Sequence, residues 1–335
     1  MLKRTIRTLA LSAVLLAAHV AQTPSWAQAP FQGEGGRVRV LSFPSGNDYP
    51  FRVIAKLGLD KKHGFELENI PIQPGGAVMT AFRSGATEGG LMNWLEIARA
   101  RSAGEDMSAV VPFLEMPNVW VVPKDSPAKD IAGLKGRKVG TYNRFAPEWV
   151  LYLAVASAKA GYNPKTESTI QEAGPGLLRG LLDQKQIEAS FIFYNLAMPM
   201  AATGDYRILF NSRDLLQRMG MAKDTMLTSV AFRDSYIKSN PKNVKAFAIA
   251  YQEAVEHLRK DDGIWVELLA TQGVTDPAVI KLMVDWSREV TMDKFSADPM
   301  SETKVLFDAL YAAGGKEATG IDRLPDGIFN TAVSK

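Results

Sequence analysis

The sequence contains no cysteine, and only His63 and His257 lie beyond residue 19 among its three histidines. The absence of cysteine excludes disulfide bonds, thiolate metal sites and a cysteine nucleophile. Neither histidine belongs to an H-E-x-x-H motif, and no G-x-S-x-G motif occurs. We therefore expect no metal, no cofactor and no hydrolytic triad, and we do not expect an enzyme.

The chain also lacks an apolar run long enough to span a bilayer. The longest, Leu9 to Val20, is shorter than the roughly 20 residues that a membrane-spanning helix needs. It follows Lys3, Arg4 and Arg7 and precedes small residues that end at Ala27 or Ala29. This pattern predicts a secretory signal peptide over residues 1–27, cleaved after Ala27 or, alternatively, after Ala29. An uncleaved membrane anchor is the other interpretation.

No excess of charge remains once the signal peptide is removed. The chain has 39 basic and 36 acidic residues, and residues 1–27 hold three basic residues and no acidic ones, which leaves 36 of each sign. Without a basic patch, binding to nucleic acid is not expected. Without cysteine, lipid attachment of the bacterial lipoprotein type is excluded as well. We expect a soluble, monomeric periplasmic protein whose length suggests two domains.

Strands alternate with helices along most of the chain. Residues 38–43 alternate apolar and polar side chains as a strand does, a helix is expected from Pro50 to His63, and residues 65–70 form the next strand. A similar pattern follows from Lys138, with a strand to Thr141 and a helix from Pro147. Such alternation predicts an α/β fold with largely parallel sheets.

Two apolar segments are candidate crossings between two such domains. They are residues 119–122 and 228–232. If both cross, one lobe consists of residues 37–120 plus 229–335 and the other of residues 121–228, with two hinge strands between them. A single continuous sheet is the alternative.

The loop after the strand that ends at Thr141 combines hydrogen-bonding and aromatic side chains. Ligands of α/β sheets bind where strands end and helices begin, because free N–H groups and a partial positive charge lie there. Thr141 and Asn143 can form hydrogen bonds, Arg144 can hold a carboxylate or sulfonate, and Tyr142 and Phe145 offer flat apolar walls. If Arg144 binds an anion, Arg144→Ala should weaken binding about ten-fold or more.

Similar loops recur at other expected strand ends. Their candidate ligand-binding residues are Ser45, Asn47, Tyr49, Gln73, Gly75, Asn93, Trp94 and Tyr194. If these loops face one another across two domains, they line one cleft. Each residue also has a plainer interpretation: asparagine and threonine shape turns, Arg144 is a surface charge, Glu148 interacts with its helix dipole, and the rings pack between domains.

Four segments carry a resemblance to a known family. They are "YPFRVIAKLGLDKKHGFELEN" (49–69), "AVMTAFRSGATEGG" (77–90), "VVPKDSPAKDIAGLKGRKVG" (121–140) and "SNPKNVKAFAIAYQEAVEHLRKD" (239–261). The chain resembles the solute-binding proteins of ABC importers for nitrate, sulfonates and thiamine-precursor pyrimidines, the type II periplasmic binding proteins. Glu88 stands where that family commonly has aspartate, and Tyr142 to Phe145 replace a plainer Gly/Ser-rich loop.

The resemblance implies two α/β lobes that are joined by two strands and close around a solute. It also implies delivery to a membrane permease driven by an ATPase. Several rings with one arginine suggest an organic solute, aromatic or anionic. Two alternatives stay open: a histidine-dependent thiamine-pyrimidine synthase, and a sensor that docks on a receptor kinase.

Overall fold

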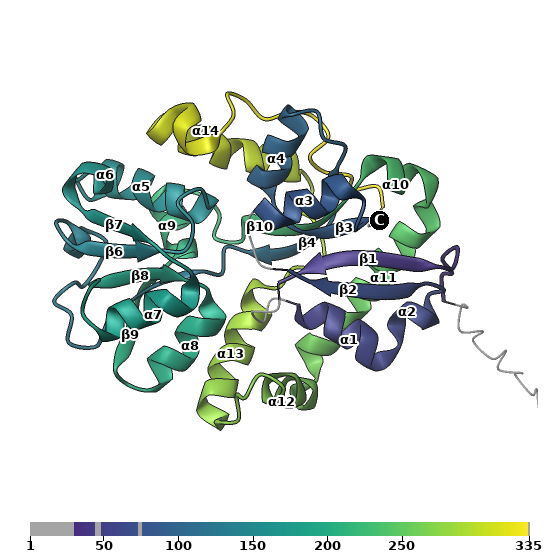
Figure 1. Cartoon of the computed structure of the whole chain (residues 1–335), viewed down its shortest axis with the longest axis horizontal. Coiled ribbons are helices and arrows are strands. Elements are labelled where there is room, and N and C mark those ends of the chain that lie inside the picture. The colour runs from purple at the N-terminus through teal and green to yellow at the C-terminus, as the bar shows by residue number, and fades with distance from the viewer. Residues whose placement is uncertain (1–29, 44–47, 73–75, 334–335) are drawn as a thin grey trace, which may run out of the picture. The chain divides into compact units, whose positions relative to one another are not determined.

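The computed structural model describes residues 30–43, 48–72 and 76–333, so the predicted signal peptide lies outside the described residues. The chain from Phe31 onward forms one compact unit. It contains two five-stranded sheets, each covered by helices (Figure 1). We call each sheet, with the helices that pack on it, a lobe.

The first sheet has the strand order β2-β1-β3-β10-β4. β1 pairs in parallel with β2 and β3, whereas β10 runs antiparallel between β3 and β4. Its strands are β1 (Arg37–Ser42), β2 (Glu66–Pro71), β3 (Gly89–Asn93), β4 (Ser108–Glu115) and β10 (Met226–Phe232).

The second sheet repeats this topology with the order β7-β6-β8-β5-β9. β6 pairs in parallel with β7 and β8, and β5 runs antiparallel between β8 and β9. Its strands are β5 (Val119–Pro123), β6 (Lys138–Thr141), β7 (Thr169–Glu172), β8 (Ala189–Ile192) and β9 (Tyr206–Asn211). Each sheet is therefore largely parallel, as the alternation predicts, with one reversed strand that arrives from the other lobe.

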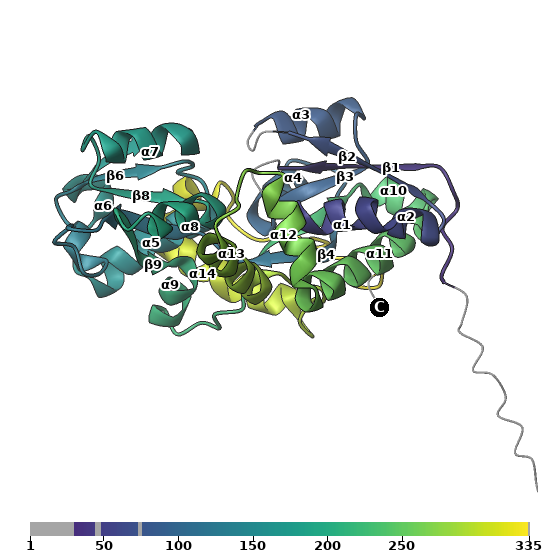
Figure 2. The same ribbon diagram turned by 90° about the horizontal axis from the view of Figure 1, so that it is seen from below.

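The helices of the first lobe follow its strands and extend through the C-terminal third of the chain. In Figures 1 and 2, α3 lies on the opposite side of the first sheet from α1 and α2. The helices are α1 (Tyr49–Leu57), α2 (Leu59–Lys62), α3 (Gly76–Ser84), α4 (Trp94–Ser102), α10 (Asp234–Ser239), α11 (Pro241–Lys260), α12 (Asp262–Ala270), α13 (Pro277–Val290) and α14 (Pro299–Thr319).

In the second lobe, α5 and α7 lie on opposite sides of the sheet (Figures 1 and 2). The helical segments are η1 (Ala132–Leu134), α5 (Pro147–Lys159), α6 (Pro164–Glu167), α7 (Pro175–Asp183), α8 (Tyr194–Ala202) and α9 (Ser212–Arg218). Two C-terminal helices also reach this lobe, since α13 contacts α8 and α14 contacts α5.

The helix predicted to run from Pro50 to His63 is interrupted. α1 ends at Gly58, whose φ of 64° is in the left-handed region, and α2 continues only to Lys62. Glycine adopts this conformation without the steric penalty of a Cβ, so it ends α1 at Leu57, six residues before the predicted end at His63.

The two connections between the lobes are short loops beside the predicted crossings. β5 pairs entirely within the second sheet and β10 entirely within the first. The chain therefore crosses at Met116–Asn118 and, after α9, returns through residues 219–225. Residues 119 and 120 thus pair with the second sheet, and residues 226–228 pair with the first sheet. Both lobe boundaries therefore lie a few residues before the predicted ones.

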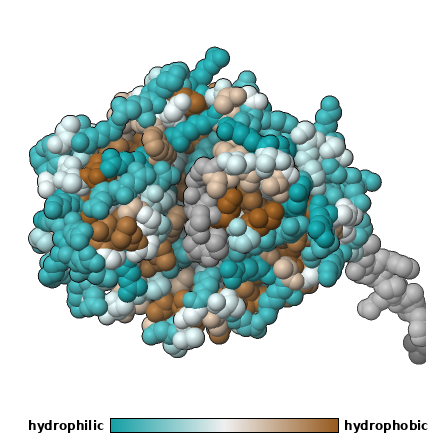
Figure 3. Space-filling model, viewed as in Figure 1, coloured by the Kyte–Doolittle hydropathy of each residue, from teal (hydrophilic) through white to brown (hydrophobic). Residues whose placement is uncertain are grey.

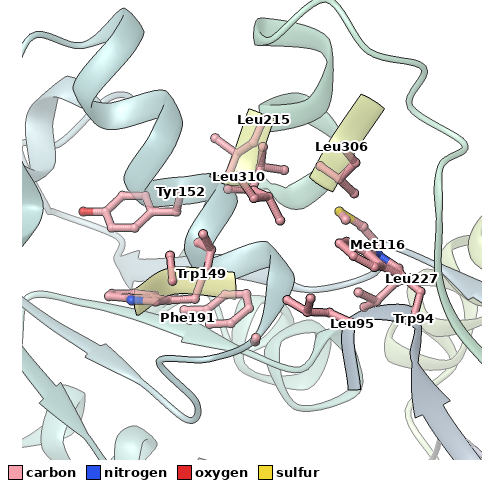
Figure 4. Close-up of a cluster of buried hydrophobic side chains, with 14 of the residues drawn as sticks. Trp94, Leu95, Met116, Trp149, Tyr152, Phe191, Leu215, Leu227, Leu306 and Leu310 are labelled. Carbon is pink, nitrogen blue, oxygen red and sulfur yellow. The ribbon is translucent and has the colours of Figure 1, made fainter. Parts of the chain in front are cut away.

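A hydrophobic cluster joins the lobes behind these connections. Figure 4 places Trp94, Leu95 and Leu227 of the first lobe opposite Trp149 and Phe191 of the second, with leucines of α14 beside them. The labelled residues that complete this view are Met116, Tyr152, Leu215, Leu306 and Leu310, and all are buried. Apolar burial therefore continues from one lobe to the other.

The segment after α14 returns to the first sheet. Ala109 of β4 donates its N–H to the Ile328 carbonyl and accepts from the Asn330 N–H, each at 2.8 Å. Phe329 forms a parallel bridge with Ala109. The end of the chain thus pairs with β4, which is the edge strand of the sheet.

Candidate functional site

The junction between β3 and α4 is built as a capping box. Asn93 ends the strand and accepts the Glu96 N–H at 2.9 Å, and Glu96 Oε2 accepts the Asn93 N–H at 3.2 Å. The reciprocal bonds satisfy two backbone donors at the start of the helix. They also hold an amide and a carboxylate at the end of a central strand.

The equivalent junction between β6 and α5 is built around a tight turn. The Thr141 hydroxyl accepts the Asn143 N–H at 3.2 Å, and Asn143 Oδ1 accepts the Phe145 N–H at 2.8 Å. Pro147 then begins the helix, where its missing N–H leaves no donor unsatisfied. The next residue, Glu148, does not cap the helix.

Glu148 instead contacts the first connection between the lobes and the start of α9. Its carboxylate accepts hydrogen bonds from Asn118 Nδ2 at 2.9 Å and from the Asn118 N–H at 3.3 Å. Its Oε1 lies 3.2 Å from the Ser212 hydroxyl. Glu148 is only 1% exposed, and this burial raises its pKa to about 7, although the hydrogen bonds from Asn118 and Ser212 act in the opposite direction. The carboxyl group therefore titrates close to neutral pH.

Tyr142 forms an aromatic wall next to this carboxylate. Its hydroxyl accepts a hydrogen bond from Asn118 Nδ2 at 3.0 Å. Its ring lies 4.2 Å from the Phe193 ring, measured between centroids. Burial, with a smaller contribution from Glu148, holds the pKa of Tyr142 well above its ordinary value. The phenol is therefore neutral and can act as a hydrogen-bond donor.

These side chains border one cavity with an empty volume of about 630 Å³, part of which is open to solvent. Figure 3 shows patches of apolar residues among mostly hydrophilic ones on this face of the molecule. The described residues that line the cavity come from both lobes and from the connection between them: Phe43, Leu91, Asn93, Glu96, Phe113, Leu114, Pro117, Asn118, Tyr142, Asn143, Ala146, Pro147, Glu148, Phe193, Leu227 and Thr228.

Three predicted site residues, Asn93, Tyr142 and Asn143, meet in this cavity. Thr141 lies directly behind them, fully buried, where its hydroxyl shapes the turn. Ser45, Asn47, Gln73 and Gly75 lie outside the described residues.

Two other predicted residues of the same loop lie elsewhere. Arg144 donates to the Ile170 carbonyl at 2.6 Å and pairs with Glu172 at 3.4 Å. Phe145 is 60% exposed, and Arg99 lies 6.0 Å from its ring centroid. Neither residue belongs to the described lining of the cavity.

The three remaining aromatic residues belong to the core. Trp94 is fully buried in the cluster of Figure 4, because it points into the lobe from the first turn of α4. Tyr49 packs on Trp265 and donates to Gln272, and the Tyr194 hydroxyl lies 3.3 Å from that of Ser287. The structure therefore places all three away from the cavity.

Sequence reasoning missed several residues that line the cavity, chiefly Glu96, Asn118 and Glu148 as functional groups. Glu96 had a readable signal, since glutamate three residues after a helix-capping asparagine predicts a capping box. The position of Glu148 depends on Asn118, which lies 30 residues earlier in the chain, and no local pattern carries that information.

The charges around the cavity are of one sign. Its described lining contains two carboxylates, Glu96 and Glu148, and no lysine, arginine or histidine. Burial raises the pKa of Glu96, and Arg99 acts against this shift. No group of three or more potential metal ligands occurs among the described residues. The site offers hydrogen-bond acceptors, amides and aromatic walls.

Comparison with solved structures shows the same fold in several proteins. The periplasmic aliphatic sulphonate binding protein SsuA from Escherichia coli is 20% identical, with a TM-score of 0.70 over 89% of this chain and 94% of that one. The alkanesulfonate-binding protein SsuA from Xanthomonas axonopodis pv. citri, bound to MOPS, is 18% identical, with a TM-score of 0.68 over 85% and 94%. The periplasmic nitrate-binding protein NrtA from Synechocystis PCC 6803 is 15% identical, with a TM-score of 0.57 over 76% and 71%.

Sequence comparison gives a family as well. The family model described as NMT1/THI5 like matches residues 49–262, which include both connections between the lobes. No curated protein sequence matches the chain. The chain is thus a member of the NMT1/THI5-like family, with the two-lobed fold of the type II periplasmic binding proteins.

Proposed function

We propose that the protein is the periplasmic solute-binding component of an ABC importer. It captures a small organic solute in the cavity between its lobes and delivers it to a permease in the inner membrane. The observation that carries this proposal is the shared cavity, to which Asn93 and Glu96 contribute from one lobe and Tyr142 and Asn143 from the other. The similar structures, which are sulfonate- and nitrate-binding proteins, support a binding role.

The connections between the lobes supply the mechanism. Rotation about Met116–Asn118 and residues 219–225 changes the distance between the two walls of the cavity. A solute that contacts both walls binds the closed arrangement more tightly than the open one, and it shifts the population by that difference. Closure also removes water and strengthens each hydrogen bond to the solute.

Interactions at the connections would change during this rotation. Arg213 of α9 pairs with Glu115 of β4 at 3.0 Å and also with Glu289 of α13. Trp286 donates its indole N–H to the Pro117 carbonyl at 3.0 Å. These contacts link the two lobes beside the cavity and form part of the equilibrium that a solute shifts.

Binding without chemical conversion fits the lining of the cavity. A thiamine-pyrimidine synthase of the histidine-dependent kind would need a histidine at the solute. His63 instead contacts Glu253 at 2.9 Å and the Phe31 carbonyl at 3.2 Å, and His257 lies on α11. Neither belongs to the described lining of the cavity.

Export is supported by the basic residues, apolar run and small residues at the N-terminus of the sequence. No helix in the described part of the chain has the length and apolar character needed to cross a membrane. A periplasmic location brings the protein to the outer face of the permease. A monomer, which needs no second copy to form the cavity, is part of the same proposal.

The test is to purify the protein from its own periplasm, denature it and identify the released small molecule by mass spectrometry. We expect one solute in stoichiometric amount. It should remain chemically unchanged after prolonged incubation with fresh protein. Cells that lack the chain should lose high-affinity uptake of that solute. Conversion of the solute, or unchanged uptake in the deletion strain, would contradict the proposal.

A further inference from the structure

One buried acceptor, on a residue that lines the cavity, has no hydrogen-bond partner within the described part of the chain. Asn118 is 2% exposed, and its Nδ2 donates to Glu148 and to the Tyr142 hydroxyl. Its Oδ1 forms no hydrogen bond with any described residue. The ionised form of Glu148 can only accept, so above the pKa of about 7 the amide of Asn118 must direct its Nδ2 to the carboxylate. An unsatisfied buried acceptor is unfavourable, so a donor on the solute would be stabilised there.

A second acceptor faces the same space from the other lobe. Glu96 uses Oε2 to accept the Asn93 N–H, and its carboxylate belongs to the lining of the cavity. Asn118 and Glu96 thus both offer acceptors at the cavity. A group with several N–H bonds satisfies them together, whereas a sulfonate or nitrate provides none.

Cations of the protein balance these carboxylates only in part, since Arg99 interacts electrostatically with Glu96 but forms no ion pair with it. Arg99, one turn after Glu96, directs its guanidinium to the carbonyls of Thr319 at 2.7 Å and Ala318 at 3.2 Å. The hydrogen bonds and electrostatic interactions of Glu148 involve no cation among the described residues. An anionic solute would therefore meet Glu96 and, above pH 7, the ionised form of Glu148 in a partly desolvated cavity.

The remaining walls suit a flat, positively charged group. Phe43, Phe113, Tyr142 and Phe193 line the cavity with aromatic faces or edges. A cation within about 6 Å of a ring centroid is attracted by the negative face of the ring. Aromatic rings and carboxylates together thus favour a planar apolar body that carries a cationic nitrogen group.

From this juxtaposition of Asn118, Glu96, Glu148 and the rings we infer that the solute is an organic cation with N–H donors, an ammonium or amidinium on a flat apolar body. The inference rests on the proposed function and specifies its solute class. It departs from the anionic solute that Arg144 suggests in the sequence, since Arg144 pairs with Glu172 outside the cavity. It also departs from the sulfonates and nitrate bound by the similar structures.

Three planar probes of nearly equal size separate charge from shape. Benzamidine is a cation with N–H donors, benzamide is neutral with N–H donors, and benzoate is an anion without them. Calorimetric titration of the full mature protein at neutral pH, after removal of bound solute, gives their relative affinities. We expect benzamidine to bind about ten-fold or more tightly than benzoate, with benzamide between them, because charge-assisted hydrogen bonds distinguish them.

Two isosteric variants assign the preference to the cavity. Glu96→Gln keeps an acceptor for the Asn93 N–H, and Glu148→Gln keeps one for Asn118. Each should reduce the preference for benzamidine over benzamide several-fold. Glu172→Gln is the matched control, because it removes a carboxylate of the second lobe that is 43% exposed and lies outside the cavity. Circular dichroism checks that each variant is folded, and Glu96→Gln alone suffices if Glu148→Gln does not fold.

Each outcome decides the inference separately from the proposed function. The inference would be overturned if benzoate or benzamide bound as tightly as benzamidine. It would also be overturned if the folded glutamine variants kept the same preference for benzamidine. Neither result would contradict the proposed solute-binding function. If no probe binds at millimolar concentration, the charge of the solute released from the native protein tests the inference. An anion there overturns the inference alone, and a cationic amine supports it. The absence of any released solute would count against the proposed function itself.

Discussion

The junctions β3–α4 and β6–α5 place an asparagine and a glutamate beside the same cavity, but they hold the glutamate differently. Glu96 is the third residue of its helix and returns to the N–H of its own cap. Glu148 is the second residue of α5, one position too early to do so, and it reaches Asn118 and Ser212 instead. A shift of one residue thus changes a local cap into a contact with the first connection between the lobes and with α9.

The largest difference between the two junctions should appear in stability. Glu148→Ala leaves the buried Asn118 N–H and Nδ2 without this acceptor, and it should lower the free energy of unfolding by about 3 kcal/mol. Glu96→Ala loses only one side of a capping box and should lower it by about 1 kcal/mol. Urea denaturation at pH 6 measures both values. Equal losses in the two variants would show that Glu148 has no special role at the connections.

The pH dependence of stability sharpens the same comparison. The pKa of Glu148 is raised from 4.5 to about 7 in the folded protein, so the folded state binds this proton more tightly than the unfolded chain does. Its contribution to stability is therefore complete below about pH 4.5 and is lost as pH rises through about 7. The loss should amount to at most about 3 kcal/mol.

Glu148→Gln provides the control for this titration. Burial also raises the pKa of Glu115 to about 7, so the wild-type stability profile contains the titration of both carboxyl groups. The difference between the profiles of wild type and Glu148→Gln isolates Glu148. A difference that stays constant between pH 4.5 and 8 would contradict the buried, titrating carboxyl group.

A smaller contrast is expected between the two asparagines. Asn93→Ala removes a helix N-cap and should lower the free energy of unfolding by about 1 kcal/mol. Asn143→Ala removes a single turn contact to the Phe145 N–H and should lower it by about 0.5 kcal/mol. Thermal unfolding at constant pH measures both changes. A larger loss of stability for Asn143→Ala than for Asn93→Ala would mean that the β6–α5 junction is the more strongly constrained of the two.

The smallest effect is expected at Arg144. Its ion pair with Glu172 joins side chains that are 45% and 43% exposed, so Arg144→Ala should change stability by about 0.5 kcal/mol or less. Solute affinity should change about two-fold or less, since the guanidinium lies away from the cavity. Calorimetry with the released solute tests this. A ten-fold loss would restore the anion-binding role predicted from the sequence.

The sequence predicts the alternation of strands and helices because burial in parallel sheets leaves long apolar strands between amphipathic helices. It also predicts that Asn93 and Asn143 follow strand ends, and both line the cavity. It does not predict that Trp94 and Tyr194 turn into the core from the first turns of their helices. Side-chain direction there depends on packing between segments far apart in the chain, as does the hydrogen bond of Glu148 to Asn118.

The C-terminal residues that pair with β4 have a consequence for the solubility of the protein. An unpaired edge strand can recruit a strand from another molecule and start aggregation. Residues Ile328 to Asn330 occupy the outer side of β4 around Ala109 and shield part of that edge. The last residues of the chain therefore protect the first sheet against intermolecular strand addition, and a shortened chain would lose that protection before it lost any residue that lines the cavity.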